Sequence, residues 1–109
     1  MRDEKHPAVY IMSNRKHGIP YIGVTSALWN RVADHKNGAF GGYTSEHQLH
    51  KLVWYEHHHT MTTAIHREKQ LKRWKRRWKL ELIDNFNPAW RDLHDEIDEL
   101  GTLVPYVER

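Results

Sequence analysis

The stretch Ala8–Thr25, AVYIMSNRKHGIPYIGVT, decides the fold. It holds two short apolar runs separated by a polar segment that ends in Gly18. Both runs are rich in β-branched and aromatic residues, and the segment between them has the composition of a turn. This pattern is typical of a β-hairpin, so we predict strands over Pro7–Ser13 and Ile19–Thr25.

The length of the polar segment also gives a strand register. If the turn is centred between Arg15 and Lys16, Tyr10 lies directly opposite Tyr21, and opposed residues share one face of a sheet. A slip of one residue would place the two tyrosines on opposite faces. Cross-strand packing is the ordinary role of such a pair, so the hairpin by itself predicts structure and not function.

Length and composition bound the class of protein. The chain has 109 residues, a net charge of +3, 10 histidines and no cysteine. We expect one domain over residues 1–109, with a core over about 7–90 and a C-terminal helix and tail over about 88–109. The lack of cysteine excludes disulfides, cysteine-based zinc sites and thiol catalysis. No apolar run approaches the ~20 residues of a membrane span and the N-terminus does not resemble a signal peptide, so we expect a cytoplasmic protein, monomeric by default.

The segment after the hairpin predicts a helix that carries two polar candidates. It begins after Thr25-Ser26, either of which can cap it, and it stops near Asn37-Gly38. Arg31 and His35 are i,i+4 neighbours at the border of its apolar stripe. A lone helical arginine is usually a surface charge, but the border position lets this one point along the face of the sheet.

A third strand, Lys51–Glu56, precedes a helix that begins near Thr60 and contains an unusual carboxylate. Glu68 projects into the middle of the apolar stripe of this helix, which comprises Met61, Ala64, Ile65 and Leu71. A carboxylate that faces a core must be paired, bound to a metal or protonated. The alternative is that Glu68 reaches the rim of the helix and pairs with Arg31.

A run of three histidines, His57–His59, connects the third strand to this helix. A zinc site is conceivable there, but adjacent residues at a strand end point in alternate directions. We therefore interpret the run as a polar strand-to-helix junction.

Basic residues are concentrated in the span 67–79, which holds about half of all lysines and arginines. Such a concentration on one element is the electrostatic footprint of phosphate binding. The alternative is a solvated helix face with Trp74 and Trp78 turned to the core. A bend near Arg73–Lys75, giving two short helices, would reconcile the apolar positions on either side. The candidate nucleic-acid-binding residues are Arg67, Lys72, Arg73, Lys75, Arg76, Arg77 and Lys79.

The last expected helix begins at Asn87-Pro88, because Asn is a good N-cap and Pro suits the first helical position. Capping is then the ordinary role of Asn87. Gly101 can end the helix, whose apolar face comprises Trp90, Leu93, Ile97 and Leu100.

The second apolar run of the hairpin contains Tyr21-Ile22-Gly23, and the first contains Ala8-Val9-Tyr10. Together they resemble the paired motifs of the GIY-YIG nuclease family, with the Gly-Ile of the first motif replaced. The resemblance extends over roughly residues 7–90 and is to small stand-alone bacterial members, related to the N-terminal nuclease domain found in excinuclease. It implies an α/β (α+β) fold with a three-stranded antiparallel sheet flanked by helices, in agreement with the strands and helices expected above. The residues that match the family pattern in order and separation are Tyr10, Tyr21, Arg31, His35, Glu68 and Asn87.

The resemblance implies a metal-dependent DNA endonuclease, with a place in DNA repair or recombination. By this likeness Glu68 holds one Mg²⁺ or Mn²⁺, Arg31 grips the scissile phosphate, and Tyr10 orients or deprotonates the attacking water. Tyr21 then contacts phosphate or water with help from His35, and Asn87 supports the geometry. DNA would lie on the basic helix. The alternatives are a nucleic-acid-binding module without catalysis and a purely structural interaction protein.

Overall fold

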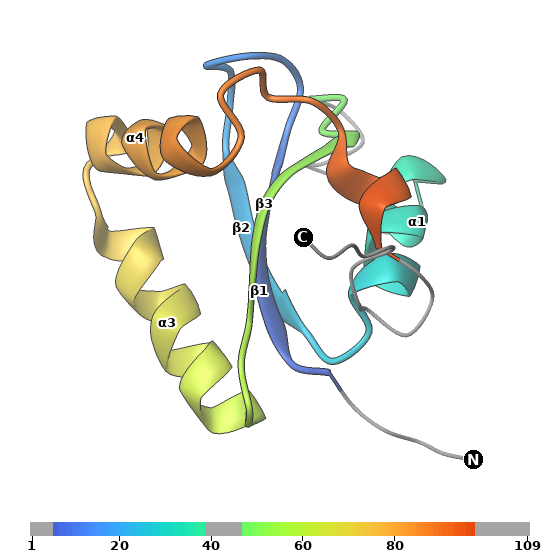
Figure 1. Ribbon diagram of the computed structural model, residues 1–109, viewed down its shortest axis with the longest axis vertical. Helices are drawn as coiled ribbons and strands as arrows, with labels where there is room; N and C mark the ends of the chain where they lie inside the picture. Colours follow the sequence, from blue (N-terminus) through green and yellow to red (C-terminus); the bar gives the residue numbers. More distant parts are fainter. Residues whose placement is uncertain (1–5, 39–46, 98–109) are drawn as a thin grey trace.

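Three strands form one antiparallel sheet at the centre of the molecule. The computed structural model describes residues 6–38 and 47–97. Strands β1 (Ala8–Ser13), β2 (Tyr21–Thr25) and β3 (Lys51–His57) pair in the order β2-β1-β3, so β1 is the central strand. The predicted three-stranded antiparallel sheet is therefore confirmed. Its two edge strands, β2 and β3, lie on opposite sides of β1 (Figure 1).

The register of the hairpin differs from the predicted one. Tyr10 lies opposite Gly23, and Tyr21 lies opposite Met12. The prediction that Tyr10 pairs directly with Tyr21 was wrong, because the partner of Tyr10 lies two residues further along β2. The predicted common face holds nevertheless, because a shift of two residues keeps side chains on the same face of a sheet.

The turn explains this shift. Its centre lies one residue later than expected, between Lys16 and His17. The Gly18 N–H donates to the Arg15 carbonyl at 2.8 Å, and His17 adopts a positive φ of 56°. The side chain of Asn14 closes the loop, because its Oδ1 accepts from the Ile19 N–H at 3.0 Å.

Helices cover both faces of the sheet. Helix α1 (Leu28–Lys36) and the 3₁₀-helix η1 (Leu93–Glu96) lie on one face, and α3 (Met61–Arg73) and α4 (Arg76–Phe86) lie on the other (Figure 1). Alternate residues of β1 supply the two cores. Ala8, Tyr10 and Met12 pack with Leu28 and Val32 of α1, whereas Val9 and Ile11 pack with Ala64 and Leu71 of α3. None of the described helices is long and apolar enough to cross a membrane.

The start of α1 and the bend between α3 and α4 follow local rules. Ala27 is the N-cap of α1, so the prediction that Thr25 or Ser26 takes this position was wrong. Thr25 acts beside it, because its Oγ1 accepts from the Ala27 N–H at 3.0 Å. The predicted bend near Arg73–Lys75 is confirmed, since Trp74 and Lys75 both have an extended ψ of 151°.

The predicted helix from Asn87 onward was wrong. Asn87 is the C-cap of α4, with φ −146° and ψ 76°, because a residue before proline avoids the helical region. The chain then turns through Trp90, whose φ is 55°, and up to residue 97, where the described part ends, it forms only the short helix η1. Leu100, Gly101 and the rest of the predicted tail lie outside the described residues.

One glycine is required by packing and not by its backbone angles. The phenol ring of Tyr10 lies so close over Gly23 that a Cβ at residue 23 would overlap its Oη and Cζ atoms. The glycine of the second motif therefore makes room on edge strand β2 for the tyrosine of the first motif.

Replacing Gly23 with alanine tests this contact. We expect the Gly23→Ala variant to lose about 1–3 kcal/mol of unfolding free energy, because overpacking in a dense core forces strained shifts. In a Tyr10→Ala background the same change should cost much less, since the ring it meets is gone. Urea unfolding of the four proteins measures the coupling. Equal costs in both backgrounds would show that the two residues do not constrain each other.

Candidate active site

Tyr10 is the centre of a buried polar cluster on the α1 side of the sheet. Its side chain is 1% exposed, although it carries a phenol hydroxyl. The Oη atom lies 3.0 Å from Nε2 of His35, which projects from α1. The two rings meet edge-on with centroids 5.7 Å apart. Strand β1 and helix α1 together fix this hydrogen bond.

The surroundings of Tyr10 keep its hydroxyl protonated. Burial raises the pKa of Tyr10 to about 12, and the nearby Tyr21 and Glu68 also raise it. The guanidinium of Arg31, which interacts with the phenol oxygen, acts in the opposite direction. At neutral pH the phenol is therefore a hydrogen-bond donor.

His35 is the hydrogen-bond partner of this hydroxyl. It is 1% exposed, and burial, followed by the charge of Arg31, lowers the pKa of its imidazole below the ordinary value of 6.5. A neutral imidazole has one lone-pair nitrogen, and in the tautomer protonated at Nδ1 its Nε2 accepts from Tyr10. The ring of Tyr21 packs edge-on against His35 with centroids 5.4 Å apart. The cluster thus joins both motif tyrosines to the same histidine.

Arg31 is the cation of this cluster. It is half-buried on α1, one turn before His35. Its charge affects the pKa values of both Tyr10 and His35, so it lies within electrostatic reach of both. A guanidinium in this position presents a planar set of donors to any anion that approaches the tyrosine.

Glu68 approaches the cluster from the other side of the sheet. It lies on α3 between Ala64 and Leu71 and is 8% exposed, as its place in the apolar stripe predicts. Helix α3 packs on β2 and β1, and the charge of Glu68 acts on the pKa of Tyr10. The carboxylate therefore lies within electrostatic reach of the Tyr10 phenol.

Lys72 is the partner of this carboxylate. Its Nζ lies 2.6 Å from Glu68 Oε2, one helical turn further along α3. Lys72 appeared among the predicted nucleic-acid-binding residues, and its role beside Glu68 was missed. The sequence feature that could have predicted this ion pair is the i,i+4 spacing of Glu68 and Lys72 on one helix.

The donors present suit a hard cation better than zinc. Within the described ranges, no group of three or more His, Cys, Asp or Glu side chains could hold a metal. Magnesium commonly binds through one or two carboxylates and completes its shell with water and substrate phosphate, so Glu68 alone fits such an ion. A structural zinc site needs four protein ligands. At the histidine run, His58 instead bonds Glu56 at 2.8 Å and Thr63 at 3.0 Å, as a strand-to-helix junction would.

Asn87 has a different position and different partners. Its buried amide donates from Nδ2 to the carbonyl oxygens of Val53, at 3.1 Å, and Arg91, at 2.9 Å. Its Oδ1 accepts from the Arg91 N–H at 3.2 Å. Asn87 thus ties strand β3 to the chain that follows α4, whereas Tyr21, Arg31, His35 and Glu68 all lie within electrostatic reach or contact of Tyr10.

The predicted nucleic-acid-binding residues differ in their surroundings, and Lys72 is already paired with Glu68. Arg67 forms an ion pair with Glu56 at 3.1 Å, and Arg76 donates to the His17 carbonyl at 2.8 Å, so both also hold the fold together. Lys79 is half-buried. Arg73, Lys75 and Arg77 are exposed around the bend between α3 and α4.

Comparison with known proteins agrees with this geometry. Residues 6–81 match the model of the GIY-YIG catalytic domain. The UPF0213 protein SSP2268 of Staphylococcus saprophyticus subsp. saprophyticus is 34% identical over 80 residues, which cover 73% of this chain and 95% of that protein. The UPF0213 protein CPE1444 of Clostridium perfringens is 34% identical over 90 residues, which cover 83% of this chain and 96% of that protein. No solved structure matches the chain.

The lowered pKa of His35 predicts a pH dependence of stability. Below pH 6.5 the imidazole of His35 binds a proton in the unfolded chain but stays neutral in the folded protein. The free energy of unfolding therefore decreases as the pH falls, until the pH reaches the pKa of His35 in the folded protein. The slope that His35 contributes is at most about 1.4 kcal/mol per pH unit. Urea unfolding of wild type and His35→Gln over this range should therefore give curves that converge as the pH falls. Parallel curves would show that His35 titrates alike in the folded and unfolded states.

Proposed function

Because the chain belongs to the GIY-YIG catalytic-domain family, we propose that it is a metal-dependent DNA endonuclease that hydrolyses phosphodiester bonds. The observation that carries the proposal is the buried hydrogen bond between Tyr10 and His35, with Arg31 and Glu68 both acting on the tyrosine. A phenol, a neutral imidazole, a guanidinium and a carboxylate are the groups that proton transfer and phosphate binding require.

Tyr10 and His35 can act together as a proton relay. In the proposed step the oxygen of a water molecule bonds to phosphorus while the bond from phosphorus to the 3′ oxygen breaks. The water proton passes to the Oη of Tyr10 as the phenol proton passes to Nε2 of His35, 3.0 Å away. This relay needs no free tyrosinate, which a pKa of about 12 would make rare at neutral pH. The departing 3′ oxygen takes a proton from solvent and the proton on His35 returns to solvent, so the expected products carry a 5′-phosphate and a 3′-hydroxyl.

The other groups bind the phosphate and the metal. Arg31 would hold the scissile phosphate, since its planar donors match two phosphate oxygens. Tyr21 would contact the phosphate or the attacking water. Glu68 would hold one Mg²⁺ or Mn²⁺, and such an ion, when bound, supplies positive charge to the departing 3′ oxygen. Lys72 is about half exposed and can turn toward solvent when a cation replaces it at Glu68.

The exposed cations at the helical bend support DNA as the substrate. Arg73, Lys75 and Arg77 lie outside the hydrogen-bonded cluster and are exposed to solvent, where phosphates can reach them. In this scheme Asn87 would not contact the substrate and would support the site only indirectly, by holding strand β3 in place. A place in DNA repair or recombination is consistent with this chemistry and is part of the proposal.

A nucleic-acid-binding module without catalysis is the second candidate. The specific observation in its favour is that Lys72 already neutralises Glu68 at 2.6 Å. If that pair persists in the presence of metal, the protein would bind DNA through its exposed cations and cut nothing.

Plasmid nicking separates the two candidates. With Mg²⁺ we expect wild type to nick supercoiled plasmid and EDTA to stop it. Glu68→Gln and Arg31→Ala should abolish nicking, and Tyr10→Phe should slow it by about 10²–10⁴-fold, because each removes a group the reaction needs. Gel analysis of the plasmid forms over time measures the rates.

Matched controls make this assay decisive. Asp95→Asn changes an exposed carboxylate on η1 and should nick at the wild-type rate. Circular dichroism should show that all variants remain folded. Equal nicking by Glu68→Gln and wild type would contradict the proposed enzyme. Salt-sensitive retention of uncut plasmid by every protein would favour the binding module.

A further inference from the structure

An aromatic groove runs along helix α4, where the helix lies against strand β3 and the bend that follows α3. Two shallow pockets, of about 320 and 230 Å³, adjoin along this helix and share Leu82 and Asn85. The α4 residues that line them are 78, 81, 82, 85 and 86, which recur at three- and four-residue intervals and so follow one stripe of the helix. We call the two pockets together the α4 groove.

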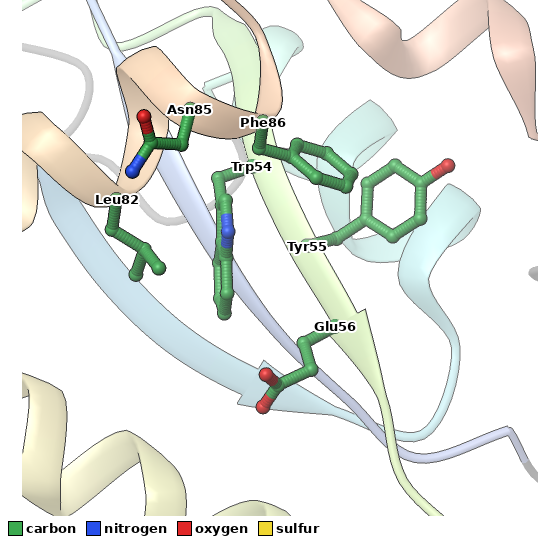
Figure 2. A pocket seen from close by; sticks show the side chains of 6 residues that line it. All are labelled: Trp54, Tyr55, Glu56, Leu82, Asn85 and Phe86. Atoms are coloured by element: carbon green, nitrogen blue, oxygen red, sulfur yellow. The ribbon is translucent and has the colours of Figure 1, made fainter.

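One end of the α4 groove lies against strand β3. Figure 2 shows the indole of Trp54 standing between Leu82 and the rings of Phe86 and Tyr55. Phe86 meets Tyr55 edge-on at 5.4 Å and Trp54 at 6.3 Å. The carboxylate of Glu56 completes this end of the groove (Figure 2).

The other end of the α4 groove is formed by two tryptophans. Trp74, in the bend, and Trp78, in α4, meet edge-on with centroids 6.0 Å apart. Within the described part of the chain, Trp78 and Phe86 are two of only three large apolar side chains that are exposed, at 42% and 47%. Exposed aromatic rings at both ends of one groove are costly in water, so they point to a ligand with flat apolar faces.

The charge around the groove indicates what that ligand is. Lys75 Nζ lies 5.7 Å from the ring of Trp78, and the Arg67 guanidinium lies 5.5 Å from the ring of Trp74. Arg73 and Arg77 are exposed next to the two tryptophans in sequence. Two carboxylates also line the groove: Glu56 is paired with Arg67, and exposed Glu81 adds one negative charge. Aromatic rings alternating with cations are the features that bind single-stranded nucleic acid, by base stacking and phosphate attraction.

The α4 groove is separate from the cluster around Tyr10. Arg67 of α3 turns toward Glu56 on edge strand β3, at 3.1 Å. Glu68, the next residue, is rotated by about 100° around the helix and acts on Tyr10. The groove and the cluster therefore lie on different sides of α3, and a strand in the groove need not occupy the cluster.

We propose that the α4 groove binds single-stranded DNA, with unpaired bases stacked on Trp78 and Phe86. Exposed Asn85 lies between the two rings along the helix and offers a donor and an acceptor to base edges. The inference rests on the proposed endonuclease and deepens it by naming its substrate class: DNA that contains an unpaired strand. The binding itself does not depend on cleavage.

Fluorescence anisotropy with a labelled short oligothymidylate, in EDTA and at fixed salt, tests this site. We expect Trp78→Ala and Phe86→Ala each to weaken binding by about five- to hundredfold, as the loss of one stacked base implies. Both variants should bind a duplex of the same length as wild type does. Ile65→Ala removes the third exposed apolar side chain, which lies on α3, and should change neither affinity.

The proposal would be wrong if Trp78→Ala and Phe86→Ala bound oligothymidylate as tightly as wild type. It would also be wrong if both variants lost the same affinity for the duplex as for the single strand. Self-association that both substitutions abolish, without oligothymidylate binding, would assign the groove to a second copy of the chain. Because the assay contains no divalent metal, its result is independent of nicking: wild type that binds the oligonucleotide but nicks nothing would contradict only the endonuclease.

Discussion

The contact between Tyr10 and Gly23 is the constraint on which the site depends. The central strand sends a large phenol across the neighbouring edge strand, and only a residue without a side chain leaves room for it. That position brings the hydroxyl to His35 on one side and within reach of Glu68 on the other. The two short motifs of the hairpin therefore form one packing unit: the glycine of the second motif makes space for the tyrosine of the first.

A set of contacts at the other end of the hairpin fixes this unit against the helices. The side chain of Asp84 in α4 accepts from Trp90 Nε1 at 2.6 Å and lies 3.0 Å from Nε2 of His17 in the turn. Arg76 of the same helix donates to the His17 carbonyl. These bonds set the angle of α4 against the sheet, and α4 in turn carries the aromatic groove. The cluster around Tyr10 and the groove are thus held by one frame, on different sides of α3.

Much of this arrangement could be predicted from the sequence because it depends on local patterns. Strand alternation, helix periodicity and the buried carboxylate of Glu68 are all visible in the chain. The predictions failed where the local sequence was compatible with two conformations and tertiary contacts determined which one forms. Asn87 before proline suits both the start and the end of a helix, and its hydrogen bond to the Val53 carbonyl stabilises the arrangement in which it ends one. The turn lies one residue later than predicted because His17 adopts a positive φ. This conformation is stabilised by the hydrogen bond from Arg76 to the His17 carbonyl. The ion pair between Glu68 and Lys72 could have been predicted from their i,i+4 spacing. It was overlooked because Lys72 is one of many basic residues in this segment.

We propose that a divalent cation binds at Glu68, near Tyr10 and Arg31. Paramagnetic line broadening by Mn²⁺ in NMR spectra tests it without any reaction. We predict that low Mn²⁺ broadens the side-chain signals of Tyr10, Arg31 and His35 in wild type, and that Glu68→Gln, while folded, loses this broadening. Broadening centred elsewhere, or unchanged broadening in Glu68→Gln, would contradict the account.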